Sequence, residues 1–415
     1  MPEPSTASAA VAVSFGRPRT RTHLILALVA PLAACSPDPS TPAHAAPHIA
    51  DSAGVRLVTY DHTPTTAAPF QLAPEPRYRH GANPGDYAFQ EVSIGRLLPD
   101  GNAVVYDPWN AELVVLGPDG TTHEVLATEG EGPGEVSFVA AILPLGRDSI
   151  LIADPGLARA TLFVGDSVAG ISALPRGARL EVEGIGASGE LLLATVVGAW
   201  GFEGEWLPGH MARFDVGSGA LDTVAAFDFW PRTPPGMQRN LIGPVGEVTV
   251  ATGHFIQTRS DKAEVTWRLP DGTVTQIVRW QGEPALLTED WLAPVEAEHR
   301  MQVRMHSPDL SEARVAEITR SDMGAYRAII GRPMPLFGSP FADAVGRVWL
   351  PSYKPGGERH SMAPYTVIAP DGEWLGTVEA SRGFHILDAG AGLVLGVERD
   401  DMDVESVVVY ELILG

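Results

Sequence analysis

Short apolar runs rich in Val, Ile and Leu recur along the chain, and Gly, Pro, Asp and Asn separate them. Runs of this length with such boundaries are typical of β-strands joined by tight turns. Two consecutive sets of four lie at 92–98, 102–107, 112–117 and 123–128, and at 140–145, 149–154, 160–165 and 168–174. The pattern predicts an all-β fold assembled from four-stranded units.

The sequence ahead of each set is repeated. The stretch "GANPGDYAF" from Gly81 aligns with "GEGPGEVSF" from Gly130, and Asp107-Pro108 then aligns with Asp154-Pro155. Self-similarity with a period of about 40 to 50 residues is a signature of β-propellers and other repeat folds. The glycine-rich stretch therefore marks a link between units. A phosphate-binding loop would need a helix after it, and a strand follows here.

Further sets bring the count to about six units. They comprise 180–186, 190–198, 210–216 and 222–229; 240–246, 247–253, 263–269 and 274–280; 336–353, 365–372 and 374–380; and 383–390, 393–399 and 404–414. The last unit has only three strands, whereas an N-terminal strand at 54–60 has no unit of its own. We predict a six-bladed β-propeller in which this N-terminal strand completes the last blade, leaving no open sheet edge at the closure.

A non-repetitive insertion at 285–334 separates the fourth unit from the fifth. Residues 287–305 and 309–322 within it have helical patterns. We expect a helical insertion between blades four and five, which acts either as a lid over the mouth of the propeller or as a plug that stabilises a wide link.

The N-terminal segment resembles an export signal. A basic stretch precedes the apolar run "LILALVAPLAA", which is too short to be a permanent membrane span. The run ends in "LAAC", which resembles the lipobox of bacterial lipoproteins, so residues 1–35 are predicted to be a signal peptide with Cys35 lipidated. The alternatives are cleavage after residue 45 and an uncleaved segment. A Pro/Ala-rich tether is expected at 36–50, and the propeller at 51–415.

Charge and cysteine content narrow the possible partners. The chain carries a net charge of −22, and Cys35 is its only cysteine. An acidic surface disfavours nucleic acid and is repelled by anionic lipid, so the lipid on Cys35 would hold the protein at a membrane. An intramolecular disulfide is impossible.

Taken together, these features resemble the six-bladed β-propeller lipoproteins of bacteria, which are related to NHL-repeat propellers. The resemblance rests on "GEGPGE" before a blade, "DP" after its second strand, "PDG" in its third turn, "GRVWLPSY", and the terminal "VERDDMDVESVVVYEL". It covers about residues 51–415. It implies the fold and a location in the cell envelope, secreted and lipid-anchored, facing the periplasm or the surface, with the outer membrane favoured; no activity is implied.

Strand alternation identifies one face of the propeller as the candidate ligand face. The links between blades and the turns between second and third strands emerge on the same face, here named the link face. Its candidate residues are Asp107, Trp109, Asp154, Trp200, Phe202, Trp206, His254 and Tyr353. Each has a structural alternative: the two Asp can bond their own turns, Glu131 and Glu135 can cap the glycine turn, and the loop aromatics can form a small core.

No catalytic motif and no metal-ligand spacing is found in the sequence. The leading hypothesis is a non-catalytic binding or interaction module whose partner is a protein segment or a glycan. The alternative is a metal-dependent hydrolase or lyase with its site in the channel mouth. A cofactor, calcium or zinc, is expected only under that alternative.

Overall fold

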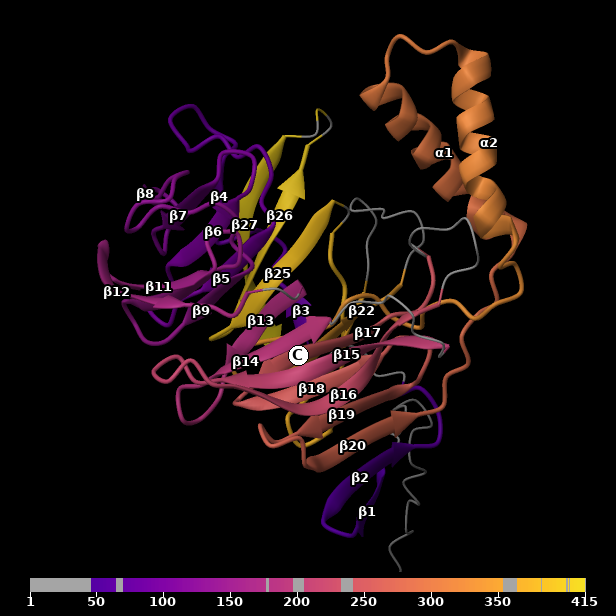
Figure 1. Ribbon diagram of the computed structural model, residues 1–415, viewed down its shortest axis with the longest axis horizontal. Helices are drawn as coiled ribbons and strands as arrows, with labels where there is room; N and C mark the ends of the chain where they lie inside the picture. The colour runs from indigo at the N-terminus through magenta and orange to yellow at the C-terminus, as the bar shows by residue number, and fades with distance from the viewer. Residues whose placement is uncertain are drawn as a thin grey trace, which may run out of the picture. The chain divides into compact units, whose positions relative to one another are not determined.

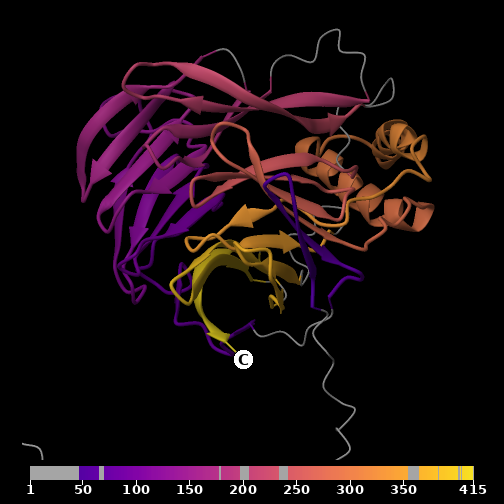
Figure 2. The ribbon, with the colours of Figure 1, turned by 90° about the horizontal axis from the view of Figure 1, so that it is seen from below.

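The computed structural model describes residues 46–64, 70–176, 179–196, 205–232, 242–353, 364–381, 383–400, 402 and 404–414. These residues form six sheets that follow one another in chain order, and two helices (Figures 1 and 2). The predicted six-bladed β-propeller is confirmed. No helix in the described part of the chain is long and apolar enough to cross a membrane. The predicted signal peptide, including Cys35, lies outside the described residues.

The first three blades each contain four antiparallel strands. Blade one comprises β5 (Ile94–Leu97), β6 (Ala103–Asp107), β7 (Glu112–Leu116) and β8 (His123–Ala127). Blade two comprises β9 (Ala141–Pro144), β10 (Ser149–Asp154), β11 (Arg159–Val164) and β12 (Ser167–Ala173). Blade three comprises β13 (Arg179–Ile185), β14 (Leu191–Val196), β15 (Trp206–Phe214) and β16 (Leu221–Pro231).

Of the remaining three blades, four and six also pair with N-terminal strands, and blade five, within the described residues, does not. Blade four comprises β17 (Gly246–Ala251), β18 (His254–Arg259), β19 (Glu264–Arg268) and β20 (Val274–Trp280). Blade five comprises β21 (Phe341–Ala342), β22 (Val348–Pro351), β23 (Tyr365–Ile368) and β24 (Trp374–Val378). Blade six comprises β25 (Phe384–Gly390), β26 (Leu393–Arg399), β27 (Glu405–Leu414), β3 (Phe70–Leu72) and β4 (Tyr78–His80).

Burial explains why the apolar runs become strands at these positions. All five residues of β6 are buried, because the second strand of a blade packs against neighbouring blades on both faces. The outermost strand β12 is mostly exposed. This gradient from inside to outside places the hydrophobic clusters between adjacent sheets.

The last blade is completed by N-terminal strands, as predicted, but not by the strand at 54–60. β27 pairs with β3 and β4, whereas β2 (Val55–Tyr60) runs parallel to β20 on the outside of blade four. A hairpin partner, β1 (His48–Ser52), pairs with β2 and begins within the predicted tether. The Tyr60 hydroxyl donates to the Gly372 carbonyl and accepts from the Trp374 backbone N–H, which fixes β2 against blade five.

Blade four also differs from the sequence interpretation. The sequence predicts strands at 240–246, 247–253 and 263–269, but β17 begins at Gly246 and β18 lies between the second and third of these ranges. Thr252 and Gly253 have φ of 47° and 75° and form the tight turn between β17 and β18. Residues 242–245 form no strand, and β18 is absent from the predicted set.

The predicted helical insertion is present in the chain between β20 and β21. Helix α1 (Glu289–His306) and helix α2 (Glu312–Arg327) pack side by side and project from the sheets (Figure 1). Ser311 caps α2 by accepting from the Arg314 backbone N–H. Buried Leu292 and Met323 join Ile242 in a small core at the base of the hairpin, so the insertion has its own hydrophobic contacts.

Candidate functional site

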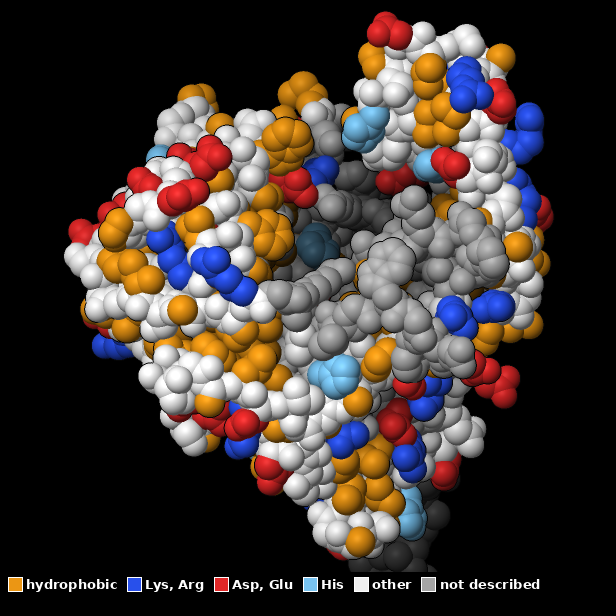
Figure 3. All heavy atoms as spheres, viewed as in Figure 1, with side chains coloured by type: hydrophobic (Ala, Val, Ile, Leu, Met, Phe, Trp, Pro, Cys, Tyr) orange, Lys and Arg blue, Asp and Glu red, His pale blue; other side chains and the backbone are white. Residues whose placement is uncertain are grey.

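The candidates from the sequence are distributed over five blades. Asp107 and Trp109 lie in blade one, Asp154 in blade two, Trp206 in blade three and Tyr353 directly after β22 in blade five, all at the link face. Trp200 and Phe202 lie outside the described residues. Figure 3 shows a face of the molecule that is hollowed between the helical hairpin and the blades.

His254 belongs to the opposite face. It follows the turn that joins the first and second strands of blade four, and Gly253 of this turn approaches Ala187 in the equivalent turn of blade three. Turns between first and second strands lie at the end of a blade opposite the links. The sequence interpretation put His254 on the link face because it missed β18.

Asp107 has a structural role at the link face. Its carboxylate is fully buried and accepts hydrogen bonds from the backbone N–H groups of Gln90 (2.9 Å), Trp109 (3.0 Å) and Asn110 (3.2 Å). These bonds join the link before blade one to a turn within the blade. They match the turn-capping alternative for this residue.

Asp154 repeats the arrangement in blade two. It accepts from the backbone N–H groups of Ser137 (2.7 Å), Phe138 (3.2 Å) and Leu157 (2.9 Å). The aligned Asp-Pro pairs of the sequence are thus equivalent in structure as well. Their oxygens are occupied by backbone groups, so the geometry supports blade assembly at both positions.

The glycine-rich link between blades one and two is also fixed by side chains. Glu135 accepts from the Gly132 backbone N–H at 2.6 Å, as the capping alternative proposed. Arg159 donates to the carbonyl oxygens of Glu131 (2.9 Å), Gly132 (2.7 Å) and Glu135 (2.6 Å). The link is therefore an ordered connection whose polar backbone groups are satisfied internally.

Two aromatic candidates remain accessible. Trp109 is 75% exposed, and its indole N–H donates to Glu91 at 3.0 Å. The guanidinium of Arg259 lies 4.4 Å from the centre of the Trp206 ring and is also paired with Asp228 and Asp261. Neither tryptophan lines the cavity described next.

A cavity of about 390 Å³ lies between blades three, four and five and the link after the helical hairpin. Its wall includes the carboxylates Glu181, Glu183 and Glu247, and the aromatic rings Phe229, Trp230 and Phe337. Of the sequence candidates that lie within the described residues, only Tyr353 lines it, and its hydroxyl donates to the Ile242 carbonyl at 3.1 Å. Cavities of this size accommodate small ligands or side chains of a partner.

The acidic wall comes from inner strands. Glu181 and Glu183 are two positions apart on β13, so both side chains leave the strand on one side, while buried Leu180 and Val182 occupy the other. Glu247 is the second residue of β17, the neighbouring inner strand. Alternating Glu and apolar residues in "LEVEGIG" signal this wall, but the run was interpreted only as a strand.

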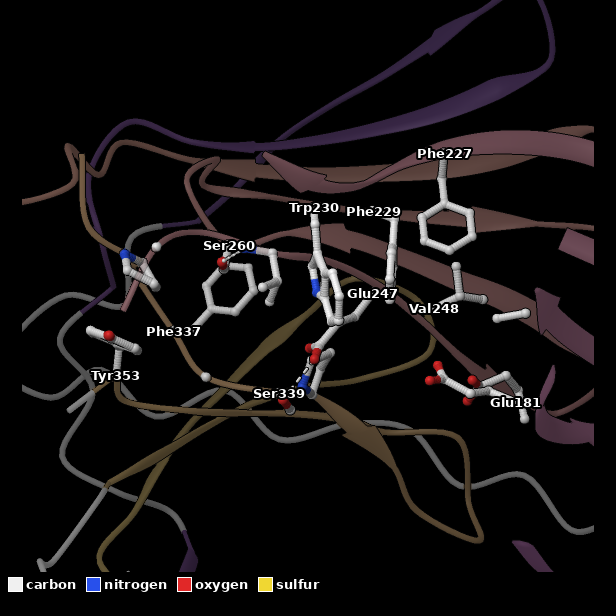
Figure 4. Close-up of a pocket in the computed structure, with 17 residues that line it drawn as sticks. Glu181, Phe227, Phe229, Trp230, Glu247, Val248, Ser260, Phe337, Ser339 and Tyr353 are labelled. Atoms are coloured by element: carbon white, nitrogen blue, oxygen red, sulfur yellow. Dashed lines mark hydrogen bonds between the residues drawn. The ribbon is translucent and has the colours of Figure 1, made fainter. Parts of the chain in front are cut away.

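The aromatic wall comes from the end of β16 and from the link before β21. Phe229 and Trp230 are stacked, with ring centres 4.6 Å apart and planes inclined by 21°. Figure 4 shows Trp230 and Phe229 pointing from their strand toward the side on which Glu247 lies. The cavity thus has an aromatic side and a carboxylate side.

Burial makes Glu183 and Glu247 unusually weak acids. Burial, followed by the nearby charges of Glu181 and Glu247, raises the pKa of Glu183 well above its usual value, against a lowering effect of Arg96. Burial also raises the pKa of Glu247 to about 7, although a hydrogen bond from the Ser339 hydroxyl at 2.7 Å favours its ionised form. Perturbed carboxyls in a cavity are characteristic of functional sites.

Elsewhere among the inner strands, a buried aspartate links blades one and six. Burial raises the pKa of Asp388 to about 6, and Arg96 lowers it. Asp388 accepts from the Leu97 backbone N–H at 2.8 Å, while Arg96 donates to the carbonyls of Gly95 and Leu387. These bonds fasten two blades together.

The described residues contain no group of three or more His, Cys, Asp or Glu side chains placed to hold a metal ion.

Comparisons with known proteins returned structures but no family. No family model matches the chain, and no curated protein does. A DUF4221 family member from Bacteroides vulgatus has 9% identity and a TM-score of 0.47, covering 83% of this chain and 99% of its own. A regucalcin, a calcium-binding protein from Agrobacterium tumefaciens, has 13% identity and a TM-score of 0.41, with coverages of 83% and 96%.

A virginiamycin B lyase from Staphylococcus aureus has 10% identity and a TM-score of 0.38, covering 82% of this chain and 99% of its own. Similarity at this level says nothing about which residues of the present chain act, or on what. Function has to be argued from the cavity itself.

Proposed function

We propose that the protein is a lipid-anchored propeller of the bacterial cell envelope that acts as a non-catalytic binding module. Its ligand, a segment of a partner protein, occupies the cavity between blades three, four and five. The single observation that carries the proposal is the composition of that cavity, which combines stacked aromatic rings with weakly acidic carboxyls. Aromatic surface supplies binding energy, and a few polar groups orient a ligand.

The position of the cavity supports this role. Its residues come from the ends of strands and from links at the link face, where insertions are tolerated because the blades provide a rigid frame. The helical hairpin packs against Tyr353 and Ile242 at the same place. A partner segment that enters the cavity can therefore also contact the hairpin.

The experiment compares two tryptophan substitutions. Trp230→Ala removes a ring from the cavity wall, whereas Trp109→Ala removes an exposed ring from the link face outside it. Peptide and glycan arrays are screened with the parent protein, and each hit is measured by calorimetry with both variants. We expect Trp230→Ala to weaken binding by at least about tenfold and Trp109→Ala to leave it unchanged. Equal affinities of the parent and Trp230→Ala would reject the cavity as the site.

The anchor is tested independently of the ligand. The basic stretch, the apolar run and the final cysteine of "LAAC" support lipidation of Cys35. In a bacterial host, the parent should incorporate a labelled fatty acid and sediment with membranes, and Cys35→Ser should do neither. Labelling of the Cys35→Ser variant would contradict the assignment.

One observation favours a second candidate. A carboxyl with a pKa of about 7 is suited to general acid–base catalysis near neutral pH, so Glu247 is the residue on which a hydrolase or lyase function would depend. Turnover of a bound ligand by the parent protein, abolished in Glu247→Gln, would favour that function over simple binding.

A further inference from the structure

Two carboxylates of the cavity, Glu183 and Glu247, receive few hydrogen bonds from the described residues. Glu183 makes no hydrogen bond to any described residue, and the side chain of Glu247 accepts only from the Ser339 hydroxyl within the same set. Arg96 acts on Glu183 through its charge, but it donates to the carbonyls of Gly95 and Leu387. Burying carboxyl groups without a cation is costly, and the cost is reduced when a ligand supplies one.

The cavity also has a surface suited to the rest of a cationic ligand. Phe229 and Trp230 are stacked on one side, and Phe337 is buried at 5% exposure on another part of the wall. The methylene stem of a basic side chain packs on aromatic rings, and the rings attract its charged end. A single lysine or arginine side chain fits within a volume of about 390 Å³ with room for its flanking backbone.

The overall charge of the chain also favours a cationic ligand. The chain has a net charge of −22, so a basic segment is attracted and an anionic one is repelled. Arg259, a cation of blade four, is already paired with Asp228 and Asp261. Among described residues, the acidic wall and the aromatic wall thus complement a positive group that comes from outside.

We infer that the cavity binds a basic side chain, lysine or arginine, of an extended partner segment, with its charge at Glu183 and Glu247 and its stem against Trp230 and Phe229. This inference rests on the proposed binding function and names the chemistry of the partner.

Binding of a cation to these carboxyls should release protons, which makes its affinity depend on pH. Without ligand, burial and the neighbouring charges of Glu181 and Glu247 raise the pKa of Glu183 well above its usual value, and the pKa of Glu247 is about 7. A cation favours the ionised carboxyls, so its binding releases protons and strengthens as pH rises. Arg96, on β5, and Ser339 oppose the raised values only in part. A neutral ligand gains nothing from ionisation of the wall.

The probe is the blocked pentapeptide acetyl-Gly-Gly-Lys-Gly-Gly-amide, titrated into the purified protein by calorimetry at pH 6, 7 and 8. Release of one proton with a pKa of about 7 predicts an affinity increase of about tenfold from pH 6 to pH 8. The same peptide with an acetylated lysine should bind at least about tenfold more weakly and without this trend. Repeating the titration in two buffers of different ionisation enthalpy measures the protons released.

Glu247→Gln tests the wall directly, because it keeps the size of the side chain and can still accept from Ser339. It should weaken binding of the lysine peptide by about tenfold and remove the pH trend. Glu373→Gln, an identical change at an exposed turn of blade five, is the matched control and should do neither. Thermal unfolding of each variant establishes that it is folded.

The outcomes separate the inference from the proposed function. Equal binding of the lysine and acetyl-lysine peptides, or stronger binding at pH 6, overturns the inference. If the lysine peptide does not bind but a neutral trisaccharide does, and Trp230→Ala abolishes that binding, the cavity is a binding site of another chemistry. In that case the binding function stands and the inference fails. If neither probe binds and no array ligand depends on Trp230, both fail.

Discussion

Two sets of acidic residues in this propeller have opposite relations to their surroundings. In blades one and two, Asp107 and Asp154 are buried among backbone N–H groups, three of which donate to each carboxylate. In the cavity, Glu183 has no hydrogen bond to a described residue, and Glu247 has one from a side chain. The first set stabilises the fold, and the second is the set that we propose contacts the charge of a ligand. Partners, and not residue type, decide which role a buried acid has.

The largest loss of stability should follow from replacing Asp107, whose carboxylate joins two segments of the fold. Asp107→Ala leaves three backbone N–H groups without their acceptor, and we expect it to lower the free energy of unfolding by about 3 kcal/mol. Urea denaturation at pH 7 measures the change. Asp154→Ala should cost a similar amount, whereas Asp166→Ala, at an exposed turn, is the control and should cost under about 0.5 kcal/mol. A loss below about 1 kcal/mol for Asp107→Ala would remove the contrast.

Glu247→Gln should raise the free energy of unfolding at alkaline pH, whereas Asp107→Ala lowers it. The folded pKa of Glu247 is about 7 and its ordinary value is 4.5, so the folded state binds the proton more tightly than the unfolded state. Its contribution to stability is present below pH 4.5 and is lost as pH rises through about 7. At pH 8 the variant should be more stable than the parent by about 2 kcal/mol, with the solvent access of the cavity reducing the full value.

Urea denaturation from pH 5 to pH 8 checks this prediction. The difference between the variant and the parent should grow with pH, and Glu373→Gln should show no such growth. A variant that is less stable than the parent at pH 8 would mean that Glu247 is compensated in the folded state and belongs with Asp107.

The contrast also shows what the sequence could and could not reveal. Apolar runs and the aligned glycine-rich links predicted the six blades, since strand periodicity and turn chemistry are local properties. The strand at 54–60 was assigned to the wrong blade, because its alternation is the same wherever it pairs, and β2 joins blade four. In blade four, the two-residue turn at Thr252 and Gly253 was overlooked, and His254 was placed on the wrong face as a result.

The cavity was missed for a different reason. Glu181, Glu183 and Glu247 lie on two inner strands that are distant in sequence and meet only when blades three and four pack against each other. The alternation in "LEVEGIG" indicated which side of the strand the acids share, but not what faces that side. Tyr353 was predicted as a candidate because the face of a loop follows from strand order, whereas its neighbours in the cavity do not.

A smaller loss of stability is expected when Arg159 is replaced, because its guanidinium donates hydrogen bonds to the link between blades one and two. Arg159→Ala removes donors to three carbonyl oxygens and should lower the free energy of unfolding by about 1–2 kcal/mol. Arg159→Lys should recover only part of this, because an ammonium cannot reproduce the planar arrangement of donors. Urea denaturation of both variants measures the two losses. Equal stability of all three proteins would show that water replaces the guanidinium at no cost.

The smallest change in stability should come from replacing Asp86. Its contribution to stability should depend on pH in the opposite direction to that of Glu247. Burial acts to raise the pKa of Asp86, but hydrogen bonds from the backbone N–H groups of Asn83 and Gly81 outweigh it and leave the pKa below its usual value. Its contribution is therefore present above about pH 4 and is lost as pH falls, the reverse of Glu247. Asp86→Asn should cost under about 1 kcal/mol at pH 7 and nothing at pH 2.5.

Denaturation of Asp86→Asn and Glu247→Gln over one pH series distinguishes the two kinds of acid in a single experiment. The cost of Asp86→Asn should disappear on acidification, and the gain from Glu247→Gln should appear on alkalinisation. Parallel pH profiles for the two variants would mean that position in the ring, and not hydrogen bonding to the carboxylate, controls these acids. Opposite profiles would tie each role to the balance between burial, which dominates at Glu247, and backbone donors, which dominate at Asp86.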